Sequence, residues 1–178
     1  MHPLTLLIML SATAPADASP QAVECVYAAT TMSDRQLIGA LAARGGGQHS
    51  APETAAINRL NESSRNCKRA NSWPENKARA SFEHARALFL LDNGKAALAA
   101  RKIPLAPVEK TYARMTPAMR DGLLAGSVDP QFSAILTNEL QKAGVKPQQV
   151  GRDGARVIGS FISARVAADR TRASFTGK

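Results

Sequence analysis

The sequence predicts an all-α protein with a single domain, a bundle or irregular array of six to seven helices around a central apolar helix at about residues 72–101. Alanine is abundant, aromatic residues make up only 4% of the chain, and no run alternates apolar and polar residues over a strand's length. Hydrophobic residues make up 44%, which excludes a disordered protein. At 178 residues, one domain is the default. The pattern leaves open whether the helices form a closed bundle or an open row of hairpins.

The segment 72–102 is apolar on nearly every side when it is drawn as a helix. Phe82, Ala85 and Phe89 follow helical spacing. The remaining faces carry three leucines, Leu88, Leu90 and Leu91. A helix without a polar face must be surrounded by other helices, so this segment is expected to lie at the centre of the domain.

Boundary signals stand at the start and in the middle of this central segment. Ser72 and Glu75 fit an S-x-x-E capping box, with Pro74 in the first turn. The Asp-Asn-Gly sequence at 92–94 is a turn signal, which favours a break into two helices. The alternative is one continuous helix that tolerates Gly94 at about 1 kcal/mol.

Three helices are expected before the central one. The first covers residues 20–30, and Ser33 can cap a continuation over residues 34–44, which three glycines end. Another helix is expected at 52–69, with Ser50 or Ala51 before it. A short turn then leads to the central helix, so these two neighbours should be antiparallel.

After the central helix, Thr116-Pro117 and Asp129-Pro130 each predict a capped helix start. The side chains expected to face inward from the helix after Thr116 are Met119, Leu123 and Leu124. Asp153 is the expected cap of the last helix. Residues 19–164 then form the helical domain, and residues 165–178 form a basic helix end and tail that we expect to fray.

The N-terminus has the pattern of a signal peptide. Residues 4–10 form a short apolar run, and Ala16-Asp17-Ala18 fits the small-x-small rule for cleavage before Ser19. No Lys or Arg precedes the run, so the alternative is an apolar N-terminal helix that is retained. This run and every later one are too short to span a bilayer. The expectation is therefore that residues 1–18 are removed and that the protein is exported, periplasmic or secreted, with no transmembrane segment in the mature chain.

Cys25 and Cys67 are the only cysteines. In an exported chain an even number of cysteines suggests a bridge. Cys67 also continues the inward row of its helix, which predicts that it is buried. The alternative is two buried thiols in a cytosolic protein. Two cysteines alone cannot form a metal site.

The sequence contains no pattern typical of a catalytic, metal or cofactor site. The histidines do not form HExxH or any pair at i and i+4, and no strand–turn–helix elbow surrounds a serine. His84 stands beside Glu83 on the central helix, where we expect it to be partly exposed rather than functional. The glutamates occupy polar helix positions and are interpreted as solvated.

The formal net charge is +9, and removal of residues 1–18 leaves 23 basic against 13 acidic side chains. Such a surface attracts anions. The basic side chains concentrate at two places, which are Arg65, Lys68 and Arg69 on one helix face and Arg165, Arg170 and Arg172 near the C-terminus. The scarcity of aromatic residues disfavours nucleic acid. The alternative is that the positive charge reflects composition alone.

These observations favour an exported binding or adaptor protein without catalytic activity, which contacts an anionic envelope component or an acidic protein. One alternative is a small cell-envelope hydrolase, which would need two carboxylates, or His84 with a carboxylate, in one pocket. Another is a periplasmic inhibitor or immunity-type protein, which small size, helicity and a disulfide would suit.

Overall fold

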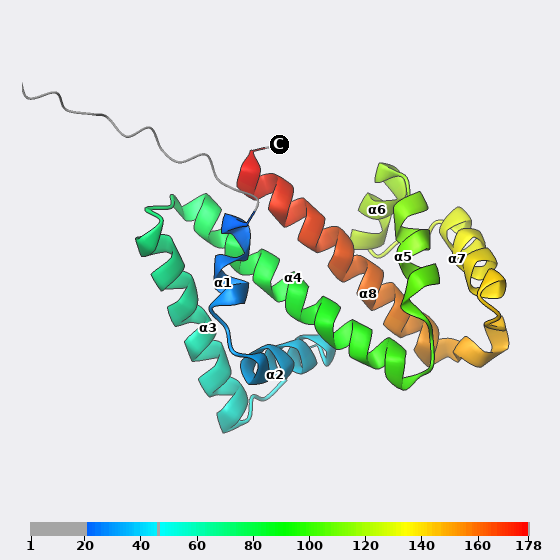
Figure 1. Cartoon of the computed structure of the whole chain (residues 1–178), viewed down its shortest axis with the longest axis horizontal. Coiled ribbons are helices and arrows are strands. Elements are labelled where there is room, and N and C mark those ends of the chain that lie inside the picture. Colours follow the sequence, from blue (N-terminus) through cyan, green and yellow to red (C-terminus); the bar gives the residue numbers. More distant parts are fainter. Residues whose placement is uncertain (1–20, 46, 178) are drawn as a thin grey trace, which may run out of the picture.

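The computed structural model describes residues 21–45 and 47–177, so the predicted signal peptide at 1–18 lies outside the described residues. The described chain is all helical, which confirms the predicted fold class (Figure 1). Its elements are η1 (Ala22–Glu24), α1 (Cys25–Ala28), α2 (Met32–Ala43), α3 (Ala51–Ala70), α4 (Glu75–Ala100), α5 (Leu105–Arg114), α6 (Pro117–Leu124), α7 (Pro130–Lys142) and α8 (Pro147–Thr176).

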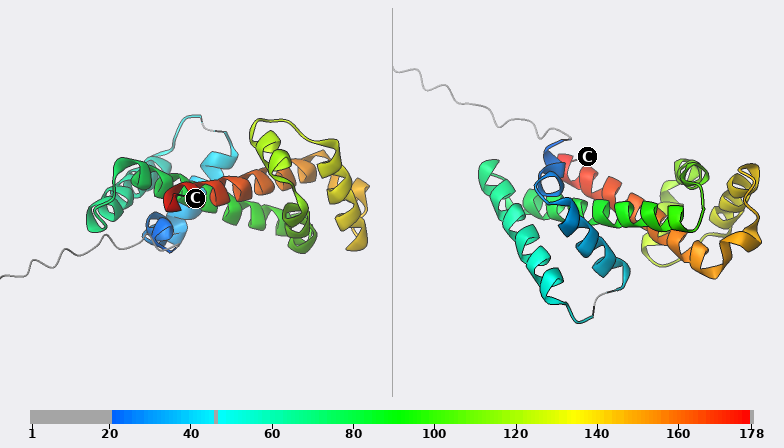
Figure 2. Two further views of the ribbon diagram at one scale, coloured as in Figure 1. Left: turned by 90° about the horizontal axis from the view of Figure 1, so that it is seen from above. Right: turned by 60° about the horizontal axis from the view of Figure 1, so that its bottom comes forward.

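The long helices α4 and α8 run side by side in opposite directions along the molecule (Figure 1). Helices α1–α3 lie at one end of this pair and α5–α7 at the other, as both views in Figure 2 show. Between residues 82 and 91 only Arg86 is exposed, because α4 contacts α8 and α1, α2, α3 and α5. The central apolar helix is therefore confirmed.

The predicted break at 92–94 is wrong, because α4 is continuous from Glu75 to Ala100. Gly94 is buried where α8 crosses, and a Cβ atom there would lie 3.0 Å from Cδ2 of Phe161. Close packing against α8 thus offsets the local turn preference of this sequence. The glycine serves the contact between the two helices.

The predicted capping box at the start of α4 is also wrong. Pro74 is the N-cap residue and no side chain caps this end. Ser72 adopts a left-handed conformation, with φ +50°. Glu75 instead accepts a hydrogen bond from Lys68, at 2.5 Å, across the turn to α3.

Four helix starts elsewhere use short polar side chains as N-caps. Ser50, Thr116 and Asp129 cap α3, α6 and α7, as the sequence predicts. Helix α2 differs, because Thr31 rather than Ser33 accepts the hydrogen bond from the backbone N–H of Asp34.

Helix α8 ends later than the sequence predicts. Its span from Pro147 joins a short first segment to the long helix across Gly151, whose backbone is not helical, with φ +60°, and Asp153 lies within the long part and is not its cap. The predicted fraying after residue 165 is not observed, because α8 continues to Thr176 and Phe175 is fully buried. The reason is packing against Val23 and against Trp73, whose ring meets Phe175 edge-on at 5.0 Å between centroids.

Apolar side chains form two main clusters. The larger one joins α4 and α8 to α5–α7, and the other joins α4 to α1–α3. Leu124 was expected to face inward but is 37% exposed at the end of α6. None of the described helices is both long and apolar enough to cross a membrane.

The predicted disulfide is present between Cys25 and Cys67. It ties α1 to the C-terminal end of α3, and Cys67 is buried as its position in the inward row predicted. At another point along α3, the carboxylate of Asp34 accepts two hydrogen bonds from Arg59, at 2.9 and 2.6 Å, which link α2 to α3.

Candidate functional site

His84 is buried rather than partly exposed, which corrects the prediction from sequence. Its Nδ1 lies 2.9 Å from the carbonyl oxygen of Ala168 and 3.0 Å from the hydroxyl of Thr171, both on α8. Its Nε2 is buried and has no hydrogen-bond partner among residues 21–45 and 47–177. Burial lowers the pKa of His84, so the ring is neutral at pH 7 and Nδ1–H donates to Ala168. This arrangement joins α4 to α8 and presents no group to a substrate.

The buried carboxylates act as counter-ions of nearby arginines and lysines. Hydrogen bonds from Arg59 lower the pKa of Asp34, and those from Lys142 and Arg114 lower the pKa of Glu139. A general acid at neutral pH needs a raised pKa, which neither group has. Over residues 21–45 and 47–177, no three His, Cys, Asp or Glu side chains are close enough together to hold a metal ion.

The three basic residues predicted near the C-terminus face different elements. Arg165 lies 3.9 Å from Asp169 on its own helix, and Arg170 pairs with Asp121 on α6. Arg172 contacts Glu24 in η1 at 2.5 Å. Each of the three therefore has an acidic neighbour on a different element.

The other predicted cluster contributes to a hollow between α3 and α4. We call it the α3–α4 notch; its volume is about 330 Å³ and it is lined by Asn61, Ser64, Arg65, Lys68, Glu75, Ala78, Arg79 and Phe82. Each helix contributes positions at i, i+3, i+4 and i+7, so two matching helix faces form the two walls. Arg69 does not line the notch and instead donates a hydrogen bond to Asn66.

The notch gathers cations from two helices. Within the described chain, Arg65 and Arg79 form no hydrogen bond or ion pair, whereas Lys68 pairs with Glu75. Three cations and one carboxylate give the notch a local charge of +2. The spacing of basic residues on α3 does not identify Arg79, because Arg79 lies on α4. It reaches the notch only because α4 folds back on α3.

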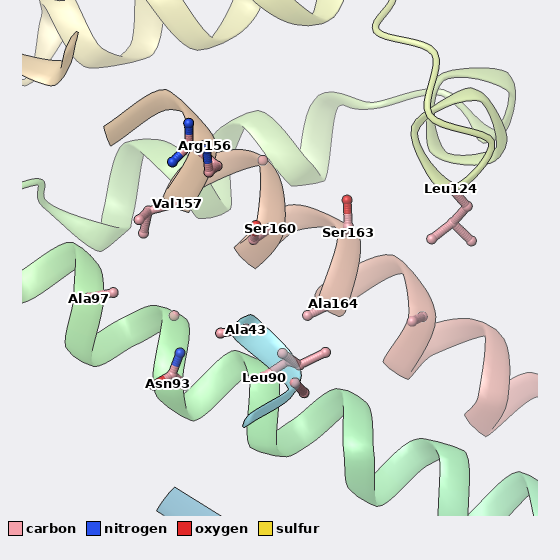
Figure 3. Close-up of a pocket in the computed structure, with 14 residues that line it drawn as sticks. Ala43, Leu90, Asn93, Ala97, Leu124, Arg156, Val157, Ser160, Ser163 and Ala164 are labelled. Atoms are coloured by element: carbon pink, nitrogen blue, oxygen red, sulfur yellow. The ribbon is translucent and has the colours of Figure 1, made fainter. Parts of the chain in front are cut away.

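A second and larger hollow lies where α4 and α8 run together. This α4–α8 groove has a volume of about 660 Å³ and is drawn in Figure 3. Its lining residues are mostly small or apolar: Ala42, Ala43, Leu90, Asn93, Gly94, Ala97, Leu124, Arg156, Val157, Gly159, Ser160, Ser163, Ala164 and Ala167. The groove was not predicted from sequence, because alanine, glycine and serine residues in a row form no recognisable motif.

No protein-family model matches the chain, and neither the curated proteins nor the solved structures contain a match to it. Function is therefore inferred from the side chains that line the notch and the groove.

Proposed function

We propose that this protein is an exported helical binding or adaptor protein, without catalytic activity, that contacts an anionic envelope component or an acidic protein through the α3–α4 notch. The observation that carries this proposal is the convergence of Arg65, Lys68 and Arg79 on one hollow that contains a single carboxylate. Guanidinium groups bind carboxylates and phosphates through paired hydrogen bonds. A partner with a multiply charged anionic group suits this arrangement best.

Export is supported by two features of the chain. The first 18 residues have the pattern of a signal peptide. The bridge between Cys25 and Cys67 is a bond that persists in oxidising compartments outside the cytosol. The net charge of +9 favours an anionic partner by long-range attraction.

The test is retention of native envelope fractions by the immobilised protein at low and high salt. We expect retention at about 50 mM salt and release at about 500 mM, because exposed charges are screened over a few ångströms at high salt. The double variant Arg65→Gln/Arg79→Gln should retain about tenfold less material than the wild type, since two charge-assisted contacts are lost.

The matched control is Lys110→Gln/Arg152→Gln, which removes the same net charge from exposed positions outside the notch. It should retain nearly as much as the wild type. Equal loss in the two double variants would mean that only net charge matters. Retention that ignores salt would overturn the electrostatic proposal.

A further inference from the structure

We propose that the α4–α8 groove is a second binding site, for an amphipathic small molecule with an apolar body and one anionic group. The proposal rests on a hollow with an apolar floor, a single cation at its rim and hydroxyl groups without partners along one wall. It is independent of the α3–α4 notch, because the two sites share no residue.

The groove has the size of a small-molecule site. Its volume of about 660 Å³ is within the roughly 300–1,000 Å³ typical of ligand pockets. The last residues of α2 form one wall and Leu124 of α6 stands at the far side, which limits the length of an occupant (Figure 3). These dimensions favour a compact ligand over an extended helix.

The groove is open because many of the side chains that line it are small. A Cβ atom added at Gly159 would meet no atom within 4 Å, so this position opens onto free space. Leu90 and Val157 are only partly buried, and Leu124 is 37% exposed. Contact with an apolar ligand would remove these surfaces from water, which is favourable.

Of the described residues that line the groove, Arg156 is the only charged one. Its one ion pair is with Asp153, at 3.2 Å, and both side chains are more than 70% exposed, so the pair is weak. In Figure 3, Arg156 and Leu124 lie at opposite ends of the groove. One available cation at one end of an apolar surface complements a ligand with one anionic group.

Neutral polar groups accompany this cation. Within the described chain the side chains of Asn93, Ser160 and Ser163 form no hydrogen bond, although all three line the groove. A carboxylate or sulfonate near Arg156 would accept one hydrogen bond from the hydroxyl of Ser160. Pockets for small ligands commonly combine apolar walls with a few polar groups of this kind.

The test uses anilinonaphthalene sulfonate, a fluorescent probe with an aromatic body and one sulfonate, and dodecanoate as its competitor. We expect saturable binding with one site per chain and displacement by dodecanoate. The variant Gly159→Leu should weaken probe binding about tenfold or more, because leucine fills open space in the groove. Removing a glycine from a helix interior also favours the fold.

Three further single variants separate the effect of charge from the effect of side-chain volume. Arg156→Gln should weaken binding about fivefold through loss of a charge-assisted contact. The controls Ala155→Leu and Arg152→Gln alter exposed positions of α8 outside the groove and should stay within about twofold of the wild type. The notch variant Arg65→Gln/Arg79→Gln should bind the probe normally, so failure at one site is distinguishable from failure at the other.

Three results would overturn the proposal. Absence of saturable probe binding is the first, and equal weakening by Gly159→Leu and Ala155→Leu is the second. The third is a wild-type dimer that Gly159→Leu dissociates, measured by sedimentation, since the groove would then be covered by a second copy. Circular dichroism of every variant shows whether it is folded, because the probe also binds partly unfolded chains.

Discussion

The two ends of the α4–α8 pair are held together by different means. Helices α1–α3 are tied by a disulfide and share a small apolar cluster. Helices α5–α7 have no such bond, and they pack against the larger cluster along α4 and α8. Helix α1 has only four residues, so it can bury little apolar surface. The disulfide is therefore at the end of the helix pair where burial of apolar surface contributes less to stability.

The two ends are more alike in their buried carboxylates. Asp34 accepts hydrogen bonds from one arginine, Arg59, which links α2 to α3. Glu139 is contacted by Arg114 at 2.8 Å and by Lys142 at 3.1 Å, which link α7 to α5 and to its own last turn. Asp34 and Glu139 thus each have one partner on another helix, and the α1–α3 end has a further ion pair between Arg44 and Glu53, at 3.0 Å, so ion pairs do not distinguish the two ends.

The largest expected effect comes from removal of the disulfide. The double variant Cys25→Ser/Cys67→Ser should lose about 4 kcal/mol of unfolding free energy, the chain-entropy value for a sequence separation of 42 residues. The measurement is urea unfolding. Hydrogen exchange should show protection lost in α1–α3 before α5–α7, whereas uniform loss along the chain would contradict the difference between the ends.

Truncation of a core side chain at the other end should have a somewhat smaller effect. Leu140 is 4% exposed and belongs to the larger cluster, so Leu140→Ala should cost about 3 kcal/mol. Protection should fall first in α7 and α5. If reduction of the disulfide in this variant lowered the hydrogen-exchange protection of α7 further, the two ends would not be independent.

The smallest effect is a pH dependence at the junction of α4 and α8. His84 is neutral when folded because burial lowers its pKa, whereas in the unfolded chain its pKa is about 6.5. The unfolded state therefore takes up a proton first as pH falls, and stability should decrease from pH 7.5 to pH 5.

The control for this pH dependence is His84→Gln, which should flatten the slope between pH 5 and 7.5. The charged groups near His84 are Arg172, Glu24 and Asp169, which both variants of the chain retain. Stability that rises as pH falls would mean that the folded ring is protonated. The measurement is urea unfolding at several pH values.

Much of the fold could be predicted from sequence because it depends on local patterns. Helix periodicity, short polar caps and prolines located most helices, and the cysteine count predicted the bridge. The errors came from contacts between distant residues. Gly94 is a turn signal locally, but packing against Phe161 keeps α4 straight, and Phe175 is held by Val23 at the other end of the chain.

The candidate sites were less accessible to sequence analysis. Arg65 and Lys68 were identified by their spacing on α3, but Arg79 joins them only through the turn between α3 and α4. The predicted cations near the C-terminus, Arg165, Arg170 and Arg172, each form an ion pair with a different acidic residue. The groove has no signature, since its defining property is the absence of large side chains at positions that face one another.

The burial of Phe175 against Val23 has a consequence for the order of folding. The first described turn of the chain is covered by nearly its last residue, and Arg172 contacts Glu24 beside it. During synthesis, η1 can dock on α4, where Ser81 donates a hydrogen bond to the carbonyl of Val23, but its contacts with Phe175 and Arg172 form only after α8 has left the ribosome. A contact that closes so long a loop forms slowly, so the side of η1 that faces Phe175 is covered late in folding.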